Sequence, residues 1–264
     1  MTVDPRAAAG FAEVADAYQR GRPSYPAQAI EAIVDALCLG ETSAVLDLAA
    51  GTGKLARLLQ PRVNEVIAVE PAAAMRAKLA ADLPGALVLD GIAEAIPLPD
   101  ESVDAVLVGE AFHWFRTTEA AREIARVLTE RGGLALLWNV PTWTTEDTPW
   151  LAAFRQIVEP HERAAGPYPA GDARWQSPLH RTRLFDTLTY VEAAHVQCLS
   201  PDDFLAQVAS RSWIANLAPE RRRAVLTDVE TLVRQQPEIS IAYRTDLYWT
   251  RCRMTAPPTA EVRS

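Results

Sequence analysis

The chain has 264 residues, which is enough for one large domain or for a core domain with an attached lid. About half of the residues are hydrophobic (49%), so the chain can bury a sizeable core, and general disorder is excluded. Lysine and arginine number 26 against 34 aspartates and glutamates, and the net charge of −8 disfavours binding to nucleic acids or to anionic membranes.

The first half of the chain alternates strand-like and helix-like segments. The clearest helix begins at Thr117 or Thr118 and is ended by the glycine pair 132–133. Right-handed crossovers between such units give a doubly wound α/β fold, whose ligands bind outside the carboxyl ends of the strands. Apolar runs that predict buried parallel strands lie at 44–48, 65–69, 87–89, 103–108 and 134–138.

The second half has a different character. Pro149 begins a helix, and residues 160–178, with four prolines and two glycines, predict a long loop. Helices are expected from Ser200 and over 218–236, followed by a strand from Ile239. We therefore expect three parts: an N-terminal cover with a cofactor-binding core (1–141), a lid or substrate insertion (142–215), and a segment that completes the core sheet (216–264).

A glycine turn follows the first predicted strand. Residues 51–56 nominally match the pattern G-x-G-x-x-G/A, which fits a dinucleotide or another nucleoside ligand. Asp47, just before the turn, would repel a pyrophosphate and favour a cationic ligand such as S-adenosylmethionine, which has an ammonium, a sulfonium and no phosphate. Glu70, after the second strand, is placed to accept hydrogen bonds from the ribose hydroxyls that both ligands carry.

Several segments together resemble one family. Residues 45–53 (VLDLAAGTG) resemble the first motif of class I S-adenosylmethionine-dependent methyltransferases, and residues 66–71 are similar to their second motif. Residues 93–104 and 123–133 resemble the adenine-side loop and a later helix and turn of the small-molecule, type 11 branch. Residues 11–26 and 111–115 are similar to the subgroup that includes trans-aconitate methyltransferases.

This resemblance implies a Rossmann-like fold with a mostly parallel seven-stranded sheet. A helical lid from the N-terminus and from an insertion after the fifth strand would cover it, and S-adenosyl-L-methionine would be the cofactor. Many relatives have aspartate where Ile92 stands, so we expect backbone groups near Ala93 to contact the adenine. The expected cofactor-binding residues are Tyr18, Arg22, Asp47, Ala49, Gly51, Gly53, Glu70, Pro71, Ile92, Ala93 and Glu110.

Methyl transfer requires alignment of the acceptor with the methyl group and exclusion of water. A carboxylate acceptor needs no base, whereas a hydroxyl needs a proton acceptor, which suits His113 just after the fourth strand. The alternative for His113 is simple packing among its aromatic neighbours. The expected substrate contacts are Tyr25, Phe112, Trp114, Arg116 and Trp175.

The predicted function is therefore methyl transfer to a small molecule, with a carboxylic acid or a hydroxyl group as acceptor. Two alternatives are an NAD(P)-dependent oxidoreductase that uses the same glycine turn and a non-catalytic S-adenosylmethionine-binding protein. The histidines and cysteines show no metal-ligand spacing, so we expect no metal site. Without a signal peptide or an apolar run of about 18 residues, we expect a cytoplasmic monomer or homodimer with no membrane or nucleic-acid partner.

Overall fold

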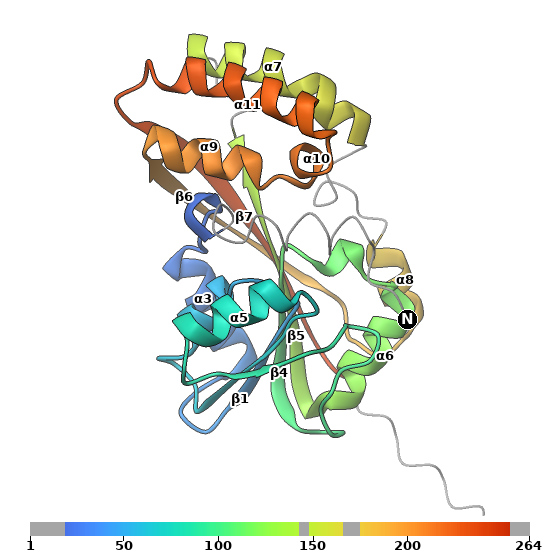
Figure 1. Cartoon of the computed structure of the whole chain (residues 1–264). Coiled ribbons are helices and arrows are strands. Elements are labelled where there is room, and N and C mark those ends of the chain that lie inside the picture. The colour runs from blue at the N-terminus through green and yellow to red at the C-terminus, as the bar shows by residue number, and fades with distance from the viewer. Residues whose placement is uncertain (1–18, 143–147, 166–174, 254–264) are drawn as a thin grey trace, which may run out of the picture.

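A seven-stranded sheet forms the centre of the molecule. Figure 1 shows the computed structural model, which describes residues 19–142, 148–165 and 175–253. The strand order is β3-β2-β1-β4-β5-β7-β6. The strands are β1 (Ala44–Leu48), β2 (Glu65–Val69), β3 (Leu87–Leu89), β4 (Val103–Gly109), β5 (Leu128–Pro141), β6 (Thr189–Leu199) and β7 (Ile239–Arg251).

The pairing of these strands confirms the predicted doubly wound, mostly parallel fold. The first five strands pair in parallel, whereas β7 runs antiparallel to both of its neighbours, β5 and β6. The central strands are buried on both faces, which explains their continuous apolar sequences. The order reverses at β1 and β4, and the gap between their carboxyl ends is where such sheets bind ligands.

Helices cover both faces of the sheet. Side chains of α3, α4 and α5 pack on one face, and those of α6 and α8 pack on the other. A short 3-10 helix, η1 (Phe112–Trp114), follows β4. The covering helices are α3 (Ala27–Leu37), α4 (Lys54–Leu59), α5 (Ala73–Asp82), α6 (Thr117–Val127) and α8 (Gln176–Arg181).

Four further helices form a layer beyond the carboxyl ends of the parallel strands, at the top of Figure 1. They are α7 (Pro149–Ala165), α9 (Pro201–Ala209), α10 (Ser212–Ala215) and α11 (Pro219–Val233). We call this layer the helical cap. Its own apolar core, which includes Phe154, Phe204 and Val229, extends onto Ile241 and Tyr243 at the start of β7. The sheet and the cap are therefore joined by shared packing.

Two predicted element boundaries and one predicted helix cap were wrong. Gly132 and Gly133 do not end a helix but lie inside β5, where a side chain at position 133 would approach Leu37 within 2.3 Å. Helix α7 continues through Pro160, because its apolar face packs in the cap core, so residues 160–165 are helical and not part of a loop. Helix α6 starts after Arg116 without a side-chain cap from either threonine.

The expected division into three parts stays a prediction, beside which the order of elements in the second half of the chain can be set. The segment 142–215 contains β6, which is an edge strand of the core sheet and not part of a lid. The segment 216–264 contributes α11 to the helical cap as well as β7 to the sheet. Among the described residues, elements of the cap and of the core sheet therefore alternate along the second half of the chain.

Candidate active site

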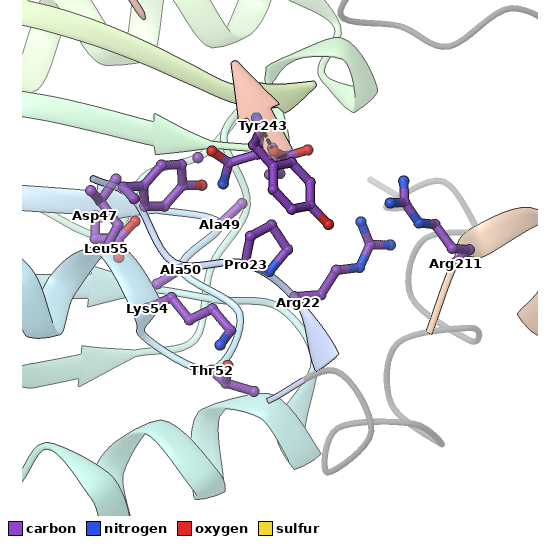
Figure 2. A pocket seen from close by; sticks show the side chains of 14 residues that line it. Arg22, Pro23, Asp47, Ala49, Ala50, Thr52, Lys54, Leu55, Arg211 and Tyr243 are labelled. Atoms are coloured by element: carbon purple, nitrogen blue, oxygen red, sulfur yellow. Dashed lines mark hydrogen bonds between the residues drawn. The ribbon is translucent and has the colours of Figure 1, made fainter. Parts of the chain in front are cut away.

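A pocket opens at the carboxyl ends of β1 and β4, below the helical cap. Figure 2 shows it with Arg22 and Arg211 on one side and Asp47 on the other. Residues from the sheet, the glycine turn, the cap and the N-terminal segment meet here, as the fold predicts for a ligand site. The lining consists of Arg22, Pro23, Tyr25, Asp47, Ala49, Ala50, Thr52, Lys54, Leu55, Gly109, Glu110, Asn139, Arg211 and Tyr243.

The glycine turn joins β1 to α4 through left-handed backbone. Gly51 and Gly53 have φ angles of 58° and 78°, which glycine adopts at little cost. A side chain at Gly53 would lie 2.8 Å from Leu79 of α5, so the turn also needs glycine for packing. Ala49 adopts φ 59° without being glycine, a local strain of the kind found at functional sites.

Glu70, at the end of β2, is tied to this turn by its carboxylate. One oxygen accepts from the Gly51 amide (2.9 Å) and the other from the Ala72 amide (2.8 Å). Burial raises the pKa of Glu70, and the two amide hydrogen bonds oppose this effect. Each oxygen keeps a second lone pair, so the carboxylate can still accept hydrogen bonds from a ligand.

Asp47 lies at the base of the pocket with 1% of its surface exposed. Its Oδ2 accepts from the Ala56 amide in the first turn of α4 (2.9 Å), so the carboxylate also fixes the start of that helix. Burial raises the pKa of Asp47 to about 7, the amide of Ala56 lowers it, and the nearby charge of Glu70 raises it. A cation bound beside Asp47 would restore its charged form.

Three basic side chains line the same pocket. Arg22 donates to the Ser210 hydroxyl and carbonyl (both 3.1 Å), and Lys54 donates to the Gln19 carbonyl (2.8 Å). Arg211, between α9 and α10, has only 4% of its surface exposed. Burial, followed by the charges of Arg57 and Arg22, lowers the pKa of Lys54 to about 8. The pocket thus combines the buried acid Asp47 with one buried and two half-buried basic side chains.

Glu110 and Asn139 close the sheet side of the pocket. Glu110 follows β4 with a left-handed φ of 60°, and its carboxylate accepts from the backbone N–H of Asn139. The Asn139 side chain donates to the Ser24 carbonyl (3.2 Å) and accepts from the Thr245 hydroxyl (2.6 Å). Asn139 therefore connects β5, β7 and the N-terminal segment.

His113 lies in η1, half-buried, and is not among the residues that line the pocket as described. The Trp138 indole N–H donates to its Nδ1 (3.2 Å), so a neutral ring carries its proton on Nε2. Burial and then the charge of Arg22 lower the pKa of His113 to about 4. In this geometry the ring offers a donor at Nε2 and no free lone pair for a general base.

The predicted substrate residues fall into two groups. Tyr25 lines the pocket, and its hydroxyl lies so near Gly109 that a side chain there would approach it within 2.2 Å. Phe112 and Trp175 are buried in the core, where their rings pack edge-on with centroids 5.7 Å apart. They are therefore part of the packing under the site and do not line the pocket, because η1 turns Phe112 towards α6 and α8.

The remaining predicted residues are not part of the pocket lining. Trp114 contacts the His113 ring, and Arg116 is exposed, pairing with Glu119 at the start of α6. Pro71 precedes α5 by two residues, and Ile92 and buried Ala93 belong to the loop after β3. Tyr18 lies outside the described residues.

Sequence reasoning missed several pocket residues. Asn139 follows the apolar part of β5 at its carboxyl end, so the rule that ligands bind after strands could have found it. Lys54 stands directly after the predicted glycine turn and could have been included on position alone. Arg211 and Tyr243 had no signal, because the cap and the antiparallel strand β7 bring them to the site from far along the chain.

Known relatives agree on one family. Residues 46–136 match a family model described as a methyltransferase domain. An uncharacterized methyltransferase of Mycobacterium tuberculosis (strain ATCC 25618 / H37Rv) is 36% identical over 234 residues, covering 87% of this chain and 88% of that protein. An uncharacterized methyltransferase-like protein of Schizosaccharomyces pombe is 34% identical over 229 residues, 86% of each chain. The chain belongs to the class I S-adenosylmethionine-dependent methyltransferase family.

Solved structures share the fold at lower identity. A candidate methyltransferase from an antibiotic biosynthesis pathway of Anabaena variabilis ATCC 29413 superposes with a TM-score of 0.62 at 22% identity, covering 88% of this chain and 99% of that one. The [4+2]-cyclase SpnF superposes with a TM-score of 0.52 at 16% identity, covering 89% and 85%. Such likeness shows the fold alone, so the reaction must be argued from the site. Within the described part of the chain, no helix has the length and apolarity to cross a membrane.

Proposed function

We propose that the protein transfers a methyl group from S-adenosylmethionine to a small molecule with a carboxylic acid or a hydroxyl group as acceptor. The observation that carries this proposal is the pair of buried acids, Asp47 and Glu70, at the glycine turn. They occupy the amides of Gly51 and Ala56, which a phosphate would otherwise use. A dinucleotide would meet two buried carboxylates there, which favours a cationic nucleoside.

The charges of the pocket fit the amino-acid end of this cofactor. Arg22 and Lys54 suit its carboxylate, Asp47 and Glu110 suit its ammonium group, and Glu70 suits ribose hydroxyls. When bound, the cofactor supplies a methyl group activated by the positive charge on its sulfur. The protein contributes alignment, the exclusion of water and a buried electrostatic environment.

Two features favour a carboxylic acid over a hydroxyl group as acceptor. Arg211 brings a guanidinium, which binds carboxylates well, to the cap side of the pocket. A carboxylate is already deprotonated at neutral pH, so it needs no base, and neutral His113 with its Nδ1 occupied does not provide one. His113 is then a donor that orients neighbouring groups. The net charge of −8 favours a small acceptor over a nucleic acid.

The test is a transfer assay with methyl-labelled S-adenosylmethionine and a panel of carboxylic acids, phenols and amines. We expect label to enter an acid as a base-labile methyl ester. Arg211→Gln should raise the KM for that acid at least tenfold and leave the affinity for S-adenosylhomocysteine unchanged. Arg183→Gln, outside the pocket, is the control. Transfer only to amines, or none despite cofactor binding, would contradict the proposed acceptor.

A further inference from the structure

The segment 19–25, which we call the strap, crosses the pocket. Arg22, Pro23 and Tyr25 form part of the lining. Gln19 is bound to the glycine turn, through its carbonyl by Lys54 (2.8 Å) and through its side chain by the Thr52 hydroxyl. Farther along, the strap is bound to the helical cap, so it links the two sides of the pocket.

Gln207 of α9 is the centre of the contact between strap and cap. It is fully buried (0% exposed), and its Nε2 lies within hydrogen-bond distance of three acceptors. These are the Gly21 carbonyl (2.9 Å), Gln197 Oε1 (3.0 Å) and the Tyr243 hydroxyl (2.8 Å). An amide nitrogen has two hydrogens, so Gln207 has one more acceptor than it can serve at once.

This surplus has a consequence for the strap. If the Gly21 carbonyl moves away, both hydrogens of Gln207 still have acceptors, on Gln197 and Tyr243. No buried donor of Gln207 is then left unpaired, which is the costly outcome when a buried hydrogen bond breaks. Detachment of the strap costs the bonds that Gln197 Nε2 (3.1 Å) and Arg22 make across the contact, but it leaves Gln207 paired with β6 and β7.

The fit at this contact is close. A side chain at Gly21 would lie 2.2 Å from the backbone nitrogen and 2.3 Å from the Cα atom of Gln207, so the strap can dock here only through glycine. The next residue, Arg22, donates to Ser210, which in turn donates to the Gln207 carbonyl (2.8 Å). The position of Arg22 in the pocket thus depends on how the strap meets Gln207.

We propose that Gln207 is a positioning residue for the reaction. Together with Gln197 of β6, it holds the Gly21 carbonyl and thereby sets Arg22 and Tyr25 in the pocket, and release of the strap from this contact lets ligands enter and leave. The inference rests on the proposed function only for the choice of ligand, S-adenosylhomocysteine, in its test.

The test measures the association and dissociation rates of S-adenosylhomocysteine by stopped-flow. Gln207→Leu removes one of the two side-chain donors to the Gly21 carbonyl, and Gly21→Ala blocks docking from the strap side, so both should populate the open strap. We expect both rates to rise on the order of fivefold, the factor for about one hydrogen bond, while Kd changes less than twofold. Ser24→Ala, an exposed strap position that bonds through its carbonyl, should leave both rates unchanged.

If the substitutions only damaged the fold, the association and dissociation rates would not rise together. A rise in the dissociation rate alone, or unchanged rates in both variants, would overturn the proposal. If Gln207→Leu does not fold, Gly21→Ala, which lies outside the cap core, decides. If the unsubstituted chain does not bind S-adenosylhomocysteine, the proposed function fails instead. The role of Gln207 is then tested by amide hydrogen exchange in the strap. Strap amides should then exchange faster in both variants than in Ser24→Ala, and equal exchange would overturn it.

Discussion

Asp47 shows at the scale of one residue how the site trades stability for binding. Its carboxylate is almost completely buried, and burial raises its pKa to about 7, so at neutral pH the carboxyl group is only partly ionised unless a cation lies beside it. A ligand ammonium would supply the missing charge. We expect Asp47→Ala to weaken binding of S-adenosylmethionine at least tenfold, as measured by calorimetry. Unchanged affinity would reject the role proposed for this carboxylate.

The same residue predicts how stability varies with pH. The pKa of Asp47 is higher in the folded protein than its ordinary value of 3.8, so the folded state binds the proton more tightly. This residue therefore lowers stability as pH rises from about 4 to about 7. Asp47→Asn, which keeps an acceptor for the Ala56 amide, should gain on the order of 4 kcal/mol at pH 8 and nothing at pH 4. Urea unfolding at both pH values measures this, and an equal gain at both would contradict it.

His113 gives a second prediction at this scale. Because burial and Arg22 lower its pKa to about 4, the ring stays neutral between pH 5 and 9, with its proton on Nε2. His113→Ala should reduce turnover about tenfold and spare cofactor affinity, while His113→Gln, which keeps a donor, should retain more activity. Steady-state kinetics across this pH range should show no ionisation near 6.5. Such an ionisation, lost in His113→Gln, would restore the role of a base.

Sequence reasoning identified the residues that follow the first two strands because the fold fixes where strand ends point. Gly51 and Glu70 are joined by a hydrogen bond, and Asp47 lies near enough to Glu70 to be affected by its charge, whereas the roles of these residues in binding a ligand stay a prediction. Sequence reasoning also placed Phe112 in the substrate site, although η1 turns this side chain into the core. Residues such as Arg211 could not be found, since only the packing of the cap brings them to the pocket.

At the scale of elements, α6 holds the loop that follows β3. Arg126 donates to the carbonyls of Ile96 (2.9 Å) and Leu98 (2.8 Å), and Glu123 accepts from the Ile96 amide (2.9 Å). The residues predicted to contact adenine, Ile92 and Ala93, precede this anchored part of the loop. Helix α6 thus fixes the conformation of this loop, although none of the predicted ligand contacts comes from the helix itself.

This anchoring is open to a direct test. Arg126→Ala removes both carbonyl contacts and should weaken S-adenosylhomocysteine binding about threefold to tenfold, because the loop must then be ordered on binding. Arg122→Ala, an exposed arginine on the same helix, is the matched control and should leave affinity unchanged. Calorimetry on both variants measures the effect. Equal affinities in the two variants would show that the loop needs no anchor.

Elements were predictable where burial imposed a pattern. The strands β1, β2 and β4 have buried apolar runs, and each was predicted within one or two residues. The edge strand β6 has mostly exposed residues and gave no alternation to recognise. Helix α7 was cut short in the prediction by Pro160, because local propensity cannot weigh a proline against packing in the cap core.

At the scale of the whole molecule, the site joins the sheet to the cap through the strap. A ligand that contacts all three should stabilise the protein as one unit, so binding should shift unfolding cooperatively. At a concentration of about 100 times its Kd, S-adenosylhomocysteine should add about 2.7 kcal/mol and raise Tm by roughly 5–10 °C. Differential scanning calorimetry measures this shift. Two separate transitions, with only one shifted, would show that cap and sheet unfold independently.

The central claim is that buried acids at the glycine turn select a cationic nucleoside over a phosphorylated one. Isothermal titration calorimetry with S-adenosylmethionine and NAD⁺, each added to the same preparation of the full chain, tests it most directly. We predict that S-adenosylmethionine binds at least a hundredfold more tightly than NAD⁺ and that Asp47→Asn narrows this difference. Equal or tighter binding of NAD⁺ would contradict the claim.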